Sequence, residues 1–407
     1  MILFPIYIDP GTGSAMFSIL LGVAATLYFV GRALIIKLKV VFSGRRKATA
    51  TAYPYVIYCE GKQYWNVFKP VIEQFEQNHT ELRYLTSSSD DPVFDTSWEY
   101  IKPEFIGEGN RSFAYLNFLT AEFVLMTTPG LDVYQLKRSK TVKHYSHLLH
   151  ALSDATAYRL FGLDYFDSVL LTGDYQGEDI RFLEKLRKLP EKQLIITGCP
   201  YMDVYEKKVK EIPPEKEHPF TVLVSPSWGA SALLSCYGEK LLDPLAACDW
   251  RIIIRPHPQS KKSEKDLLNR LESRYSGKNF IWDYERENIY SLVKADIMIS
   301  DFSGIIFDYI CLFDKPVLYV NYKFDSRPYD ADDLDHELWQ FKTIKEAGIE
   351  LLEKDIPQIL EVIKNARDNE SLAAARRKAG ETAWQYRGEA GKRIYDFMIE
   401  TVNKGKL

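Results

Sequence analysis

Short apolar runs alternate with amphipathic segments through most of the chain, and this alternation restricts the fold more than any other feature. Residues 53–61, 81–88 and 121–130 are apolar runs that end in turn residues, which indicates buried strands. Between the first two, residues 62–78 repeat apolar side chains at helical spacing. Strands that alternate with helices form βαβ units, so we expect a parallel sheet. From about His147 onward we expect a helix.

The alternation starts again after a break at residues 211–219, where three prolines stand among charged residues. A chain of 407 residues is long enough for two large hydrophobic cores. We therefore predict an α/β protein with two consecutive domains, residues 53–212 and residues 213–407, the second including the closing helices. Such domains place a cleft where the C-terminal ends of both sheets face one ligand.

The first 52 residues differ from the rest of the chain. No charged residue lies between Asp9 and Arg32, and residues 15–31 are nearly all apolar or small. About 20 such residues span a bilayer as a helix. Basic residues follow this run, whereas a cleaved signal peptide carries them before it. We expect a tail and one transmembrane helix over residues 1–36 and a basic linker over 37–52, in the inner (cytoplasmic) membrane with the domains cytoplasmic. A signal peptide and a buried core helix are the alternatives.

Charge and cysteine content exclude several classes of protein. Lys and Arg total 52 against 56 Asp and Glu, so the net charge of −4 gives no general attraction for nucleic acid, and we expect no such partner. The five cysteines are scattered and match neither a disulfide framework nor a zinc site, which suits a reducing compartment. The sequence contains no dinucleotide-binding glycine loop, no Walker loop and no nucleophile elbow. It therefore lacks the motifs of dehydrogenases, P-loop proteins and hydrolases.

The segment SDFSGIIFDY, residues 300–309, follows an apolar strand and opens a helix. Ser303 and Gly304 stand where the first backbone N–H groups of that helix are free, and the helix dipole favours an anion there. We expect a phosphate site; the alternative is an ordinary helix capped by one of the segment's own Ser or Asp residues. Asp308, about one turn after Gly304, is placed to accept hydrogen bonds from ribose hydroxyl groups, unless it is a solvated helix charge.

Two other strand ends carry candidate ligand contacts. Arg255 and His257 stand in the sequence RPHP directly after a strand, and two prolines restrict the backbone around His257. Both side chains are placed to contact a ligand phosphate; the alternative is a buried histidine that satisfies a loop carbonyl. Residues 223–234 end a strand in a loop of small residues that includes Ser227, a weaker indication of a phosphate or substrate site.

Three histidines, His144, His147 and His150, recur at intervals of three residues. This spacing does not put all three on one helical face, and neither an HExxH motif nor a carboxylate-rich set accompanies them. We therefore expect no metal, and we expect one of the three to act as a general base. The alternative is that they cap or pack.

Taken together, RPHP, SDFSGIIFDY and KPVLYV resemble the CDP-glycerol glycerophosphotransferase family, whose members make teichoic-acid-type polymers. The resemblance is best over about residues 140–330, and the N-terminal YIDPGTGS with its apolar run resembles a membrane-anchored branch. It implies a glycosyltransferase-B-like fold of two Rossmann-like domains, the first on the acceptor side and the second binding the CDP-activated donor, with no metal or other cofactor. The implied reaction moves glycerol phosphate, or another polyol phosphate, to a glycan, lipid or polymer hydroxyl at the cytoplasmic membrane face and releases CMP.

Carried over by position, the resemblance assigns His150 and His257 to catalysis, with His150 on the base side. It assigns the remaining candidates to the donor, with Asp308 at the ribose: Ser227, Arg255, Ser303, Gly304 and Asp308. The alternatives in function are a glycosyltransferase that uses a nucleotide-sugar donor, and a non-catalytic membrane scaffold that binds a nucleotide or a glycan.

Overall fold

The computed structural model describes residues 52–405 except 278, 286, 322, 323 and 368, together with Tyr28 and Gly31. The chain divides into two compact units, Met1–Ala52 and Tyr53–Leu407. The expected transmembrane helix and basic linker, residues 1–52, lie outside the described residues apart from those single positions. Among the helices that the structure describes, none has the length and apolar character needed to cross a membrane.

Seven strands form the first sheet, in the order β3-β2-β1-β4-β5-β6-β7, and every pair is parallel. The chain builds β2 and β3 on one side of β1 and then crosses to β4 on the other, so the strand order reverses between β1 and β4. The expected parallel sheet is confirmed. The bounds are β1 (Tyr53–Cys59), β2 (Leu82–Thr86), β3 (Ile101–Phe105), β4 (Ala121–Met126), β5 (Val142–Leu148), β6 (Ser168–Leu171) and β7 (Gln193–Ile196).

The helix expected from about His147 is wrong, because this residue belongs to strand β5. In the parallel pairing with its neighbours, His147 lies opposite Met126 of β4 and Val169 of β6. The strand is rich in polar residues, yet most of it is buried. Its polar groups find partners inside the sheet; Ser168 Oγ, for example, donates to Ser146 Oγ at 2.8 Å. Such pairing allows polar residues in a buried strand and hides its apolar signal.

Six parallel strands form the second sheet, in the order β10-β9-β8-β11-β12-β13. The order reverses at β8, which lies between β9 and β11. This sheet repeats the logic of the first, as the restart of the sequence alternation predicts. Its bounds are β8 (Thr221–Val224), β9 (Arg251–Ile254), β10 (Phe280–Trp282), β11 (Ile297–Ser300), β12 (Val317–Tyr319) and β13 (Ile349–Glu350).

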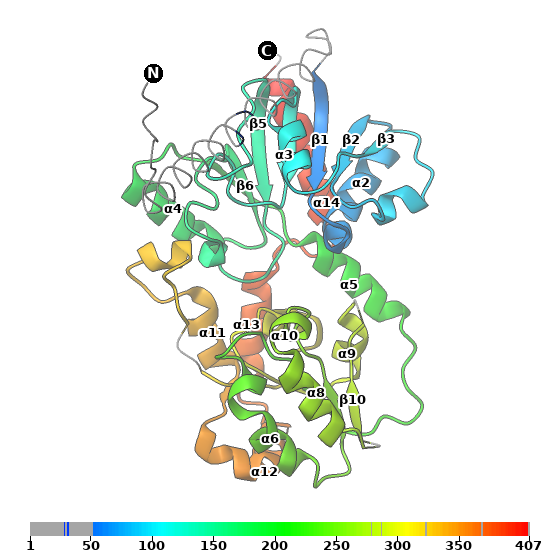
Figure 1. Cartoon of the computed structure of the whole chain (residues 1–407), viewed down its shortest axis with the longest axis vertical. Helices are drawn as coiled ribbons and strands as arrows, with labels where there is room; N and C mark the ends of the chain where they lie inside the picture. The colour runs from blue at the N-terminus through cyan, green and yellow to red at the C-terminus, as the bar shows by residue number, and fades with distance from the viewer. Residues whose placement is uncertain are drawn as a thin grey trace, which may run out of the picture. The chain divides into compact units, whose positions relative to one another are not determined.

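Helices pack on both faces of each sheet (Figure 1). On the second sheet, for example, α6 and α12 cover one face while α10 and α11 cover the other. Both faces of a parallel sheet must be covered in this way, which is why most of the strands are near-continuous apolar runs. The bounds are α2 (Trp65–Gln77), α3 (Asn110–Leu116), α4 (Tyr175–Arg187), α5 (Pro200–Glu211), α6 (Leu233–Leu245), α7 (Ser260–Ser263), α8 (Lys265–Arg274), α9 (Ile289–Lys294), α10 (Ile305–Phe313), α11 (Trp339–Ala347), α12 (Ile359–Arg367), α13 (Ala373–Ala383) and α14 (Ala390–Lys404), with short 3-10 turns η1 (Lys62–Tyr64), η2 (Pro92–Asp95), η3 (Ala155–Ala157), η4 (Asp330–Asp333) and η5 (Glu353–Gln358).

The last helix returns to the first sheet. The closing helices were expected to belong with residues 213–407, but Ile394 and Met398 of α14 pack in the same core as Phe68 of α2 (Figure 1). Gly391 permits this close approach, because a Cβ there would lie 2.5 Å from the Pro70 carbonyl oxygen. We call residues 53–211 with α14 the first-sheet half, and residues 220–383 the second-sheet half.

Buried charges join the two halves. Arg187 at the end of α4 forms ion pairs with Asp330 and Asp333 of η4, both at 2.7 Å. Asp154, in the loop after β5, accepts hydrogen bonds at 2.9 Å from the first two backbone N–H groups of α11. A carboxylate at a helix N-terminus satisfies donors that the helix itself leaves free. The two halves therefore have a defined contact, in which these polar groups add to an apolar cluster that includes Met202 and Phe307.

Candidate active site

Most of the candidate donor-side residues lie in loops at the C-terminal ends of three adjacent strands, β9, β8 and β11. The strand order reverses at β8, so the connections leave in opposite directions there. In open parallel sheets, this reversal opens the crevice in which ligands bind. The sequence alone placed Arg255, His257, Ser227, Ser303 and Gly304 at strand ends, and the structure brings their loops to one edge of the sheet.

The N-terminus of α10 is open. Gly304 is the N-cap residue, it is exposed, and no side-chain hydrogen bond from it caps the helix. Its φ of −59° is accessible to any residue, so the glycine is not required by backbone conformation. A Cβ at this position would meet no atom within 4 Å. The space in front of the first turn of this nine-residue helix is therefore open, as an anion site requires, although the N–H groups of Ile306 and Phe307 already donate to the Ser303 and Gly304 carbonyl oxygens.

Asp301 organises this edge, although sequence reasoning considered it only as a helix cap. Its buried carboxylate accepts hydrogen bonds at 2.9 Å from the backbone N–H groups of Ser227 and Leu233. It thereby ties the end of β11 to the loop after β8 and to the start of α6. Burial raises the pKa of Asp301, and its backbone hydrogen bonds oppose that change. Ser227 is buried as well, and its Oγ has no hydrogen-bond partner among the described residues.

His257 presents one ring nitrogen as a donor. Its Nδ1 accepts a hydrogen bond from the backbone N–H of Gln259 at 3.1 Å, so the neutral ring carries its proton on Nε2. Burial lowers the pKa of His257, and the nearby Glu264 and Asp301 oppose this effect. The half-exposed ring of Trp228 lies beside it, with centroids 6.2 Å apart. Trp228 was visible in the loop motif, but sequence reasoning gave it no role.

Arg255 is engaged within the protein. Its Nη1 pairs with Asp283 Oδ2 at 2.5 Å, and its Nη2 donates to the Glu285 carbonyl oxygen at 2.7 Å. The side chain is about one-tenth exposed. This arginine therefore holds the segment after β10 against the end of β9. A contact with the donor phosphates stays a prediction for Arg255.

Asp308 lies between the two halves of the protein. It is buried on α10, where the Tyr201 hydroxyl of α5 donates a hydrogen bond to it. Burial raises the pKa of Asp308 to about 7, and the Tyr201 hydrogen bond opposes that change. This burial excludes the alternative that Asp308 is a solvated helix charge. Its expected contact with a ribose is not tested by this geometry, and no sequence pattern pointed to Tyr201.

The three histidines of the first-sheet half have different surroundings. His144 stacks on Phe123 with ring centroids 4.8 Å apart, and its Nε2 is 2.8 Å from Ser168 Oγ. His147 is fully buried. His150 lies just beyond the end of β5, is partly exposed, and contacts the ring edge of Tyr64 at 4.9 Å. Of the three, His150 alone combines a strand-end position with a path to solvent.

The protonation of His150 is controlled by its surroundings. Burial of the imidazole lowers the pKa of His150 to about 4, against a weaker opposing effect of the Leu148 backbone. The ring is therefore neutral at physiological pH, as a proton acceptor must be. The described residues contain no cluster of three metal-ligating side chains.

A polar cavity is lined in part by residues of η1 and α2. It has a volume of about 270 Å³, and three lysines line it together with one carboxylate, Glu287: Lys62, Lys69 and Lys208. Each of these lysines pairs with a carboxylate, and the pair of Lys208 and Glu287, at 2.6 Å, joins the two halves. Lys62 belongs to the same short turn η1 as Tyr64, whose ring contacts His150.

Comparison with known proteins identifies a family whose sequence profile this chain matches. The sequence profile of the family described as CDP-Glycerol:Poly(glycerophosphate) glycerophosphotransferase matches residues 54–400. No curated protein sequence matches the chain.

Solved structures show the same fold at low sequence identity. A variant of the wall teichoic acid polymerase TagF soaked with CDPG is 13% identical, covers 94% of this chain with 98% of its own, and has a TM-score of 0.60. MnaA of S. aureus in complex with UDP is also 13% identical, with coverage of 86% and 97% and a TM-score of 0.60. A putative UDP-N-acetylglucosamine 2-epimerase of Listeria monocytogenes has 13% identity, coverage of 84% and 95%, and a TM-score of 0.56. The α/β fold with two parallel sheets is thus similar to that of glycosyltransferase-B proteins.

Proposed function

Because this chain belongs to the CDP-glycerol glycerophosphotransferase family, we propose that it transfers glycerol phosphate, or another polyol phosphate, from a CDP-activated donor to a hydroxyl group of a glycan, lipid or polymer. CMP is the second product. Membership of the family makes the protein a transferase; the donor, the acceptor and the residue roles below are parts of the proposal.

The open N-terminus of α10 supports the donor site. The positive end of the α10 dipole, open at Ser303 and Gly304, would bind the pyrophosphate of the donor without a metal. The Nε2–H group of His257 would donate to a phosphate oxygen, because Nδ1 is already occupied by Gln259. Negative charge moves onto CMP as it leaves. A fixed N–H group at that position therefore stabilises the transition state more than it stabilises the bound substrate.

The acceptor would approach from the first-sheet half. Its hydroxyl oxygen attacks the β-phosphorus and forms the new P–O bond, while the bond from that phosphorus to the bridging oxygen breaks. The bridging oxygen leaves with CMP, and the acceptor proton passes to His150. The position of His150 just beyond the end of β5, where it is partly exposed, supports this direction of approach. Catalysis then consists of positioning, charge stabilisation and general base assistance.

The proposed location is the cytoplasmic face of the inner membrane, anchored by residues 1–36 as a single span. The apolar run of residues 15–31 and the basic residues after it support this placement. The full chain is expected to remain with washed membranes after carbonate extraction, and the chain from residue 53 onward to be released. Release of the full chain under the same conditions would contradict a transmembrane anchor.

Donor selectivity tests the reaction itself. Purified full-length protein in detergent, given a polyol or glycan acceptor and a panel of CDP- and UDP-activated donors, should release CMP from CDP-glycerol or a related CDP-polyol. UDP release from nucleotide sugars would instead indicate a glycosyltransferase. Tight CDP-donor binding with no product from any donor–acceptor pair would indicate a non-catalytic scaffold.

A further inference from the structure

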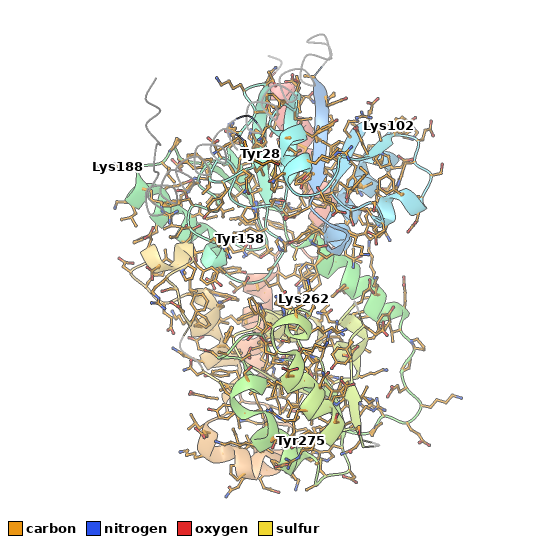
Figure 2. The ribbon with its side chains drawn as sticks, viewed as in Figure 1. Tyr28, Lys102, Tyr158, Lys188, Lys262 and Tyr275 are labelled. Atoms are coloured by element: carbon orange, nitrogen blue, oxygen red, sulfur yellow. The ribbon has the colours of Figure 1, made fainter. Side chains whose placement is uncertain are left out.

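The hydroxyl group of Tyr158 lies between two imidazole rings of the first-sheet half. Its Oη is 3.2 Å from His147 Nε2 and 3.4 Å from His150 Nδ1. Tyr158 follows η3 and faces the second-sheet half, where its backbone carbonyl accepts a hydrogen bond from Asp330 N at 2.9 Å. Figure 2 labels Tyr158 at that boundary.

One hydroxyl proton cannot serve both nitrogens, so two arrangements exist. In the first, Tyr158 donates to His147 Nε2 and accepts a hydrogen bond from His150 Nδ1–H, which leaves Nε2 of His150 unprotonated. In the second, Tyr158 donates to His150 Nδ1 and accepts from His147 Nε2–H, which leaves the proton of neutral His150 on Nε2. Only the first arrangement lets Nε2 of His150 take a proton.

The surroundings of His147 keep it neutral. The ring is fully buried and lies edge to face with the ring of Phe166, and burial keeps the pKa of His147 well below its usual range. His147 therefore carries one proton. Its Nδ1 has no hydrogen-bond partner among the described residues, and Tyr158 is the polar group that its Nε2 contacts. The first arrangement, with the His147 proton on Nδ1, is the one that a base at His150 Nε2 requires.

The remaining groups around His150 do not compete for this role. Tyr64 of η1 touches the His150 ring through its own ring edge at 4.9 Å. Glu60 acts on Tyr64 rather than on His150, and its Oε2 accepts a hydrogen bond from the Thr128 hydroxyl at 3.0 Å. Burial raises the pKa of Tyr158, so the hydroxyl stays protonated and cannot itself act as the base.

We infer that Tyr158, oriented by the buried His147, is the positioning residue that sets the tautomer of His150 and leaves its Nε2 free to accept a proton from the acceptor hydroxyl. This inference rests on the proposed function for its catalytic consequence. The tautomer itself is a property of the protein without substrate. When His150 takes the acceptor proton, the resulting imidazolium keeps its Nδ1–H···Oη hydrogen bond, so Tyr158 also stabilises the charge that forms.

Two substitutions should change the tautomer of His150 in different ways. Tyr158→Phe removes the only hydroxyl in the chain of hydrogen bonds, so His150 should become a mixture of both tautomers. His147→Leu fills the same apolar space but removes the acceptor, so Tyr158 becomes free to donate to His150 Nδ1 and should drive His150 to the Nε2–H form. Tyr64→Phe is the matched control, since it removes a hydroxyl beside the same ring without touching Nδ1.

The measurement is ¹⁵N NMR of histidine-labelled full-length protein in detergent, with the His150 signals assigned by their loss in His150→Gln. Wild type and Tyr64→Phe should show Nδ1–H at His150, and His147→Leu should show Nε2–H. In CMP-release kinetics, kcat should fall by about 10- to 100-fold in Tyr158→Phe and His147→Leu, the range for losing an orienting hydrogen-bond partner. The KM for the donor should be unchanged, because neither residue touches it.

Several outcomes would overturn the inference. An unchanged His150 tautomer in both variants would show that Tyr158 does not control it. A changed tautomer with wild-type kcat would show that the tautomer does not matter for catalysis. If wild type releases no CMP from any donor, the proposed function fails, and the NMR spectra still decide whether Tyr158 sets the tautomer.

Discussion

Replacing His150 by alanine is expected to lower CMP release by about 10²–10⁴-fold, the usual contribution of a general base. The alanine variant should keep its affinity for the CDP-donor, because His150 lies in the first-sheet half and the candidate donor site lies on the second sheet. Single-turnover measurement of CMP release, together with donor titration, separates the two effects.

The pH dependence of this reaction follows from the burial of His150. An unperturbed histidine has a pKa of about 6.5, but the pKa of His150 is lowered to about 4. The base is neutral above its pKa, so protonation of His150 should not change the rate as pH falls from 8 to near 5. It should decrease only as pH approaches about 4. The alanine variant should lose this acidic limb.

His144→Gln is the matched control for the base assignment. His144 stacks on Phe123 and bonds Ser168 within the sheet, so its replacement should affect stability and leave turnover per folded molecule near that of wild type. If His150→Ala keeps the wild-type rate, His150 is not the general base. His150 would then be a packing residue, as His144 is by its surroundings.

Gly304→Val is expected to weaken binding of the CDP-donor by roughly 10- to 100-fold. Hydrogen bonds to a charged group contribute about 1.5–3 kcal/mol, and a branched side chain at the start of α10 would keep the phosphate from the backbone there. The fold should be retained, because the backbone angles suit any residue and a Cβ meets no atom within 4 Å. Isothermal titration calorimetry with CDP-glycerol measures the change directly.

A graded pair of variants sharpens this test. Gly304→Ala adds one carbon and should have a smaller effect than valine at the same position. Gly277→Val serves as the control, since this exposed glycine precedes β10 at the opposite edge of the same parallel sheet. Equal donor affinities in wild type and Gly304→Val would mean that the anion site lies elsewhere. Equal losses in Gly304→Val and Gly277→Val would indicate a general loss of structure.

Much of the fold could be predicted because burial leaves a local record in the sequence. The strand Tyr53–Cys59 and the strand Ile297–Ser300 are covered on both faces and therefore appear as continuous apolar runs. Strand β5 could not be recognised in this way, because its buried polar side chains are paired with neighbouring strands. The packing of α14 on the first sheet could not be predicted either, because an amphipathic pattern does not identify the sheet against which a helix packs.

The candidate site divides along the same line. Periodicity and turn residues alone determined that His257, Ser303 and Gly304 stand at the ends of parallel strands, and parallel strands end at a common edge. Only the tertiary structure decided which polar groups face a free space and which face each other. Arg255 pairs with Asp283. Asp308 accepts a hydrogen bond from the hydroxyl of Tyr201, which is 107 residues away in sequence.

The three histidines show the physical reason most clearly. Their spacing at His144, His147 and His150 is a local property, and the sequence determined it completely. Their chemistry depends on burial and on partners such as Phe123, Ser168 and Tyr158, which only the assembled sheet and its loops bring to them. The pKa and tautomer of an imidazole are set by whatever the folded chain places within a few ångströms of it, and the spacing of residues in the sequence does not record those neighbours.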